Sequence, residues 1–198
     1  MADAGPWILW VDGVGGFLVC PAATVTLGQG FADPPADVPL VADVSRHHAT
    51  IRRDGESYWL DAQKATTVNR QQVARTLLKG DDRIGLGDSC QLLFSRPEPL
   101  SASARLTSIG GHRFGDPVDA VLLMAQTLIL SRAPQAHIVA PELSDRVVLF
   151  RDGAGLAVRA SGAIRSGAST CRERAPLTFG VPVTIEDVTL MLEPRGSV

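Results

Sequence analysis

Side chains with different chemistry gather in the segment Val44–Ala49, whose sequence is Val-Ser-Arg-His-His-Ala. Ser45 carries a hydroxyl, Arg46 a guanidinium, and His47 and His48 each an imidazole. A hydroxyl beside an imidazole can form a nucleophile and its base. A hydroxyl beside a guanidinium can hold a phosphate, because the planar guanidinium meets two phosphate oxygens at once. The rest of the sequence indicates which of these two uses is the better interpretation.

Catalysis is poorly supported by the spacing of these residues. The chain has no Gly-x-Ser-x-Gly segment, the turn that presents a nucleophilic serine in many hydrolases, and Ser45 and His48 stand close together on one loop and strand start. The acidic pair Asp81-Asp82 follows Gly80 in a predicted turn, which gives it a structural explanation. We therefore expect a protein that is not an enzyme.

Metal and cofactor sites lack their usual spacing as well. The 4 histidines form no His-Glu-x-x-His motif, and Cys20, Cys90 and Cys171 stand far apart. The glycine-rich segment 13–16 precedes no predicted helix, so a hairpin turn is a better interpretation than a nucleotide-binding loop. We expect no metal and no cofactor, and we expect the cysteines to be small buried residues in a reducing compartment.

Composition and charge argue against further classes of protein. The 198 residues include 19 Lys and Arg against 21 Asp and Glu, so no basic field attracts nucleic acid. The apolar run 120–130 is interrupted by Gln126 and Thr127. It is much shorter than a membrane span, which needs about 20 residues. The first ten residues have no Lys or Arg, unlike a secretory signal. We expect a cytoplasmic protein that binds neither nucleic acid nor a membrane.

Short strands joined by tight turns position the polar residues. The sequence predicts strands over 49–53 and 57–61 around the turn Asp54-Gly55-Glu56, and over 83–86 and 90–95 around Gly87-Asp88-Ser89. A further strand over 7–11 ends at Asp12-Gly13. Strands spaced roughly ten residues apart are typical of a β-sandwich or β-barrel. We therefore expect an all-β fold.

An internal repeat divides the chain into two halves. Three pairs of segments match: 16–29 with 119–132, 53–55 with 151–153, and 84–94 with 183–192. The period of about 100 residues is that of a whole domain rather than a solenoid unit. We expect two tandem β-sandwiches, residues 1–97 and 105–198, joined by a short Pro-containing linker over 98–104.

The first half resembles the forkhead-associated (FHA) domain, a β-sandwich that binds phosphothreonine peptides. The matching residues, in order, are Leu27-Gly28-Gln29, Val44-Ser45-Arg46-His47-His48-Ala49, Tyr58-Trp59-Leu60-Asp61, Val68-Asn69 and the segment 78–87. The second half is similar to this fold only through the internal repeat, because it has Leu143-Ser144-Asp145-Arg146 in place of the Ser-Arg-x-His-Ala motif. The resemblance implies two tandem FHA-like sandwiches, the second more divergent.

In the first half, the resemblance implies a phosphate-binding surface on the loops. Ser45 stands at the position of the phosphate-contacting serine, Arg46 follows it at the loop tip, and His48 stands at the position of a histidine that braces this loop. Gln29 stands where the family has an arginine, and a neutral amide lacks the charge-assisted part of a hydrogen bond to phosphate.

Other candidate contacts depart further from the family pattern. Lys64 stands where the family has an asparagine that clamps the peptide backbone, and Lys64 and Arg70 are candidates to supply positive charge. In the second half, Arg132 stands at the position of Gln29, and Ser144 lies near the serine position. Arg132 and Ser144 are therefore the second-half candidates.

Two functions agree with these observations. The first is a non-catalytic, signalling-type interaction module that binds a protein phosphorylated on Ser or Thr, with an affinity lowered by Gln29 and Lys64. The alternative is a structural or assembly scaffold whose FHA fold binds an unphosphorylated protein or a second copy of itself. The sequence leaves the partner and the oligomeric state open.

Overall fold

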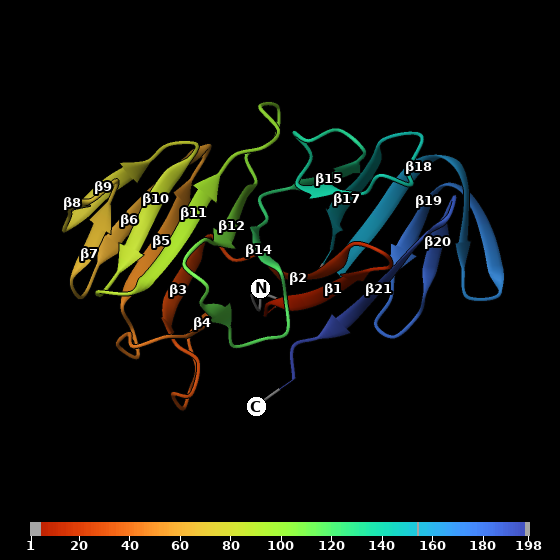
Figure 1. Cartoon of the computed structure of the whole chain (residues 1–198). Coiled ribbons are helices and arrows are strands. Elements are labelled where there is room, and N and C mark those ends of the chain that lie inside the picture. Colours follow the sequence, from red (N-terminus) through yellow and green to blue (C-terminus); the bar gives the residue numbers. More distant parts are fainter. Residues whose placement is uncertain (1–4, 154, 197–198) are drawn as a thin grey trace.

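The computed structural model describes residues 5–153 and 155–196, which form strands and loops and no helix (Figure 1). The all-β prediction is thus confirmed. Among these residues there is no helix of the length and apolarity needed to cross a membrane. The strands are β1 (Trp7–Val11), β2 (Gly15–Cys20), β3 (Thr24–Gln29), β4 (Val38–Val41), β5 (Ala49–Asp54), β6 (Ser57–Ala62), β7 (Thr66–Val68), β8 (Gln71–Gln72), β9 (Arg75–Leu78), β10 (Asp82–Leu86), β11 (Cys90–Ser95), β12 (Ala104–Ser108), β13 (Arg113–Phe114), β14 (Ala120–Leu123), β15 (Thr127–Ser131), β16 (Ile138–Val139), β17 (Val147–Asp152), β18 (Gly155–Ser166), β19 (Ser169–Leu177), β20 (Val183–Ile185) and β21 (Val188–Pro194).

The strands form two sheets. A 6-stranded sheet has the order β13-β4-β3-β5-β6-β9. A 15-stranded sheet has the order β16-β15-β17-β18-β20-β21-β1-β2-β14-β12-β11-β10-β7-β8, and β19 pairs with β18. The two sheets face each other across a core that includes Leu27, Ile51, Leu60, Phe94 and Leu106, and so form an FHA-like β-sandwich.

The predicted hairpins form at the expected turns because glycine allows the left-handed backbone there. β5 and β6 pair from Ala49 opposite Ala62 to Asp54 opposite Ser57, and Gly55 in their turn has φ +58°. The repeat equivalent, β17 with β18, turns at Gly153, also with φ +58°. Since an L side chain is strained at such an angle, glycine fixes the turn in both halves.

The large sheet runs across residues 98–104. β12, which begins at the end of this segment, pairs with β11, and β14 pairs with β12, so that both strands extend the sheet of the first half. Conversely, β1 pairs with β21 near the end of the chain. β2 and β14 are parallel neighbours in the middle of the sheet, where Phe17 lies opposite Ala120 in the same register as the sequence repeat.

The second half therefore supplies β12, β13 and β14 to the sandwich of the first half, while β1 and β2 of the first half contribute to the core of the second half. In Figure 1 β12 and β14 continue the left-hand sandwich, while β1 and β2 lie with β21 beside the right-hand strands. The structure thus demonstrates an FHA-like sandwich without demonstrating two separate domains. The boundaries 1–97, 98–104 and 105–198 stay a prediction.

The exchanged strands explain the longest apolar segments of the sequence. Successive side chains of a strand point to opposite faces, and a strand that is buried on both faces is apolar throughout. In β1 and β2, Leu9 and Phe17 pack into the second-half core, whereas Ile8 and Leu18 pack into the first-half core. The side chains of β14 also alternate between the two cores, and this alternation accounts for the apolar run that begins at Ala120.

Arg195, after the last strand, contacts the first sandwich. Its Nη1 donates hydrogen bonds to the carbonyls of Ala36 and Asp37, at 3.2 and 3.1 Å, and its Nε lies 3.1 Å from Oδ2 of Asp116. The side chains of Arg195 and Asp116 are only 13% and 6% exposed. The hydrogen bonds to Ala36 and Asp37 hold the β3–β4 loop against the segment that follows β21, and the buried ion pair holds the connection between β13 and β14 there as well.

Candidate functional site

Loops from three connections meet at the end of the first sandwich where β3 and β6 end. The backbone N–H of Gln29 donates to the carbonyl of Ser45 at 3.1 Å. The N–H groups of Gln63 and Lys64 donate to the carbonyl of His48 at 3.0 and 3.1 Å. These hydrogen bonds hold the β4–β5 loop, residues 42–48, between the end of β3 and the β6–β7 loop, residues 63–65.

Gly28 allows the β4–β5 loop to lie directly on β3. A Cβ atom at this position would lie 1.9 Å from the carbonyl oxygen of Arg46. No real side chain tolerates such a contact with backbone, so the loop can take this path only over a glycine.

His48 braces the same loop from inside. Its side chain is buried, with 3% exposure, and its Nδ1 accepts a hydrogen bond from the N–H of Ser45 at 3.2 Å. Because Nδ1 accepts, Nε2 carries the proton and donates to the carbonyl of Ala65 at 2.9 Å. One imidazole thus links the loop that carries Ser45 to the loop that carries Lys64, as the resemblance implies.

Four of the candidate side chains share this end of the sandwich and remain available to a ligand. Gln29 and Ser45 are half-buried, and Arg46 and Lys64 are exposed. Within the described chain, no hydrogen bond or ion pair involves the Ser45 hydroxyl or the side chains of Gln29, Arg46 and Lys64. The arrangement offers a hydroxyl, an amide and two cations to an anion.

The structure does not bring Arg70 to this group. Arg70 lies in the turn between β7 and β8, at the opposite end of β7 from Lys64, and has φ +68°. Its neighbour Asn69 donates from Nδ2 to Oδ1 of Asp82 at 2.8 Å and accepts from the N–H of Arg83 at 3.0 Å. The Asn-Arg pair forms a two-residue turn, which is a structural explanation of both residues.

In the second half, Ser144 already binds an internal carboxylate. Its N–H and its hydroxyl donate to Oε2 and Oε1 of Glu186, at 2.7 and 2.8 Å. These hydrogen bonds hold the pKa of Glu186 below its usual range. Arg132 lies exposed just after β15. No motif could reveal Glu186 as the partner, because it is far from Ser144 in the sequence and comes close only through folding.

Among the residues that the structure describes, no group of three or more His, Cys, Asp or Glu side chains is arranged to hold a metal ion. The buried thiols of Cys20 and Cys90 are free, and burial raises the pKa of Cys90 to about 11. Such a thiol is protonated at neutral pH and is a poor nucleophile and metal ligand.

Comparison with a family model supports the resemblance. Residues 25–87 match the family model of the FHA domain. Three solved structures are similar to this chain. The FHA-2 domain of the Mycobacterium tuberculosis ABC transporter Rv1747 is 23% identical, covers 46% of this chain and 78% of its own, and has a TM-score of 0.36.

The Rv0020c FHA structure is 30% identical, covers 43% of this chain and 89% of its own, and has a TM-score of 0.31. The N-terminal FHA domain of EssC, a component of the bacterial type VII secretion apparatus, is 13% identical, covers 97% of this chain and 94% of its own, and has a TM-score of 0.25. No curated protein matches the chain.

The family match begins within β3 and ends just after β10, so it contains both the loops that meet above β3 and the bracing histidine. FHA domains generally bind phosphothreonine peptides and are not catalytic. The chain therefore contains an FHA domain, at residues 25–87.

Proposed function

We propose that this protein is a non-catalytic interaction module that binds a phosphothreonine-containing protein at the loops around Ser45. One observation carries the proposal. The Ser45 hydroxyl and the Arg46 guanidinium lie on a loop that His48 braces from below, and neither group has a partner within the described chain. A phosphate would accept hydrogen bonds from both.

Gln29 and Lys64 adjust the strength of this interaction. The amide of Gln29 can donate to phosphate without a charge, and a hydrogen bond between neutral and charged groups is weaker than one between two ions. Lys64 offers a point charge in place of a side chain that would pair with peptide backbone. We infer an affinity lower than that of a site with arginine and asparagine at these positions.

Replacing Gln29 by arginine, the residue that the family has at this position, tests this proposal. Gln29→Arg adds a guanidinium at the end of β3, so we expect phosphopeptide affinity to rise by about 1–2 kcal/mol, roughly five- to thirtyfold. The measurement is fluorescence anisotropy with a degenerate phosphothreonine peptide pool. The matched control is Gln72→Arg, which adds the same charge to the exposed strand β8 at the other end of β7.

The scaffold hypothesis predicts a different result. If the fold binds an unphosphorylated partner, Gln29→Arg leaves the affinity for the phosphorylated pool unchanged. An equal gain with Gln72→Arg would show general charge attraction and would also contradict the proposal. In the second half, the N–H and the hydroxyl of Ser144 both donate to the carboxylate of Glu186, so neither is free to bind a phosphate. This observation favours a scaffold function for the second half only.

A further inference from the structure

A groove of about 470 Å³ lies at the junction of the two halves. Its floor is the outer face of β11 and β12, with Leu93 and Thr107, and the connection between β15 and β16 contributes Pro134 to its wall. Gly87, in the β10–β11 loop, lies beside Asp43 and His48, whereas Ser95 and Arg96 lie at the other end of β11. The groove is therefore separate from the loops around Ser45.

Two arginines line this groove with their hydrogen-bonding capacity almost unused. The Nε atoms of Arg96 and Arg105 are both buried and have no hydrogen-bond partner. Nη1 of Arg105 makes one long hydrogen bond, 3.4 Å, to the carbonyl of His137. Each guanidinium has five N–H donors, so nearly all of the donors of the pair are free within the described chain.

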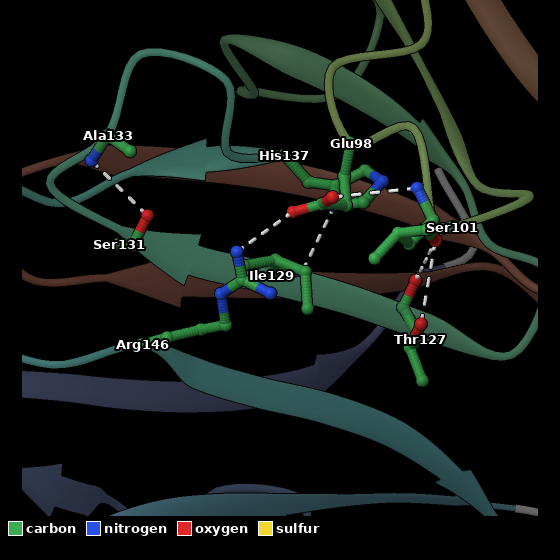
Figure 2. Close-up of polar contacts among 9 residues, drawn as sticks. Glu98, Ser101, Thr127, Ile129, Ser131, Ala133, His137 and Arg146 are labelled. Carbon is green, nitrogen blue, oxygen red and sulfur yellow. Dashed lines mark hydrogen bonds and ion pairs between the residues drawn. The ribbon is translucent and has the colours of Figure 1, made fainter.

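The acidic groups nearby form no ion pair with these two arginines within the described chain, although the charge of Asp119 partly offsets the effect of burial on the pKa of Arg105. Glu98 is held by Arg146, with 3.2 Å between Oε2 and Nη2, as Figure 2 shows. Asp81 lines the groove, but no ion pair within the described chain includes it, Arg96 or Arg105. His137 accepts a hydrogen bond from the N–H of Ile129 at 3.0 Å (Figure 2), and burial lowers the pKa of its imidazole, which makes it neutral at neutral pH.

The position of Arg105 disfavours the charged form of its guanidinium relative to the same group in water. Burial lowers the pKa of the Arg105 guanidinium, because the charge has lost part of its water shell. A charge that has lost part of its water shell is ordinarily paired, and two guanidinium groups that line one groove with free N–H donors are complementary to one oxyanion with several charged oxygens.

We propose that Arg96 and Arg105 bind a phosphate-sized dianion in the groove between the two halves. The phosphate is either free in solution or attached to a side chain of a partner protein. Junctions between structural units are common ligand sites, and here strands β11 and β12 from either side of residues 98–104 form the floor. The site is independent of the proposed binding at Ser45.

Inorganic phosphate is the first probe. The side-chain Nε–Hε resonances of the arginines are followed by NMR while phosphate replaces chloride at constant ionic strength. We expect saturable shifts of the Arg96 and Arg105 resonances. Arg105→Gln should weaken binding about tenfold or more, and Arg105→Lys, which keeps the charge without the fork, should fall between Arg105→Gln and the unmodified protein.

Arg172→Gln is the matched control, because Arg172 is exposed on β19 and has no partner within the described chain. If Arg105→Gln fails to fold, Arg96→Gln takes its place. A second titration uses a phosphothreonine peptide pool on the Ser45→Ala background, so that loss of the Ser45 site and loss of this groove give different results. Shifts with either probe support the proposal, and the probe that gives them identifies the source of the phosphate. Unsaturable shifts of equal size at all exposed arginines, or no shift with either probe, would overturn it.

Discussion

At the scale of single residues, the β4–β5 loop is held by one contact that is local in sequence, between Ser45 and His48, and by longer-range contacts to the end of β3 and to the β6–β7 loop. Ser45 and His48 are three positions apart, and Gly28 directly precedes Gln29. The short motif therefore contains the local part of the brace, and His48 forms hydrogen bonds with Ser45 and with Ala65. The phosphate contact of Ser45 stays a prediction. A short motif could not predict where Arg70 and Glu186 lie. The position of Arg70 depends on a turn, and Glu186 meets Ser144 through a long-range contact.

The two adjacent histidines give a matched test of the brace. His48→Ala leaves the N–H of Ser45 and the carbonyl of Ala65 without their shared partner, whereas His47 is exposed and makes no such bonds. We expect His48→Ala to lower the free energy of unfolding by about 2 kcal/mol or more and to weaken phosphopeptide binding. His47→Ala should change stability by less than about 0.5 kcal/mol.

Chemical denaturation and peptide anisotropy measure the two effects. Equal stabilities of the two variants would show that the buried imidazole does not hold the loop.

At the scale of elements, turn residues and alternating side chains were sufficient to predict the hairpins. Asp54-Gly55 and Arg151-Asp152-Gly153 mark the same turn in both halves, and both strand pairs are present. The partners of β1, β2 and β14 were not predictable. These strands are apolar on both faces, so their pattern fits a place beside either β11 or β21 equally well.

Arg195 tests whether the end of the chain stabilises the β3–β4 loop. Arg195→Ala leaves Asp116 and the carbonyls of Ala36 and Asp37 unpaired in a largely buried place. Removing one partner of a buried ion pair is strongly destabilising, so we expect the free energy of unfolding to fall by about 3 kcal/mol. Arg172→Ala, at an exposed position, is the control.

Denaturant unfolding gives the comparison, and Asp116→Ala completes a double-mutant cycle. Additive losses in that cycle would contradict a direct interaction between the two side chains.

At the scale of the whole molecule, the exchange of strands makes the two halves one hydrogen-bonded unit. The internal repeat predicted two similar halves, and the sheet shows that β1 of the first half pairs with β21 of the second, while β12 of the second half pairs with β11 of the first. An internal repeat reports that two segments have the same local structure. It does not report which copy each segment pairs with, and this is why the exchange was not predictable.

A disulfide tests this arrangement. Leu93 and Thr107 lie directly opposite each other on β11 and β12. Residues paired in this way have Cα atoms about 4.5–5.5 Å apart, within the range of a disulfide. In a Cys171→Ser background, Leu93→Cys with Thr107→Cys should therefore form an intramolecular disulfide on mild oxidation, detected by mass spectrometry of peptides. Leu93→Cys with Trp10→Cys is the control, since β1 would take the place of β12 if the halves did not exchange strands.

A disulfide between positions 93 and 10, with none between positions 93 and 107, would contradict the exchange of strands and would indicate two separate sandwiches.

We propose that the loops around Ser45 bind a phosphothreonine peptide. The most direct measurement is fluorescence anisotropy of the whole chain with a phosphothreonine peptide pool and its unphosphorylated twin, each repeated with Ser45→Ala. We predict binding of the phosphorylated pool that is weakened about tenfold or more in the variant, because a hydrogen bond from the hydroxyl to a charged phosphate is lost. Equal binding of the two pools, or phosphate-dependent binding that Ser45→Ala leaves intact, would contradict the claim.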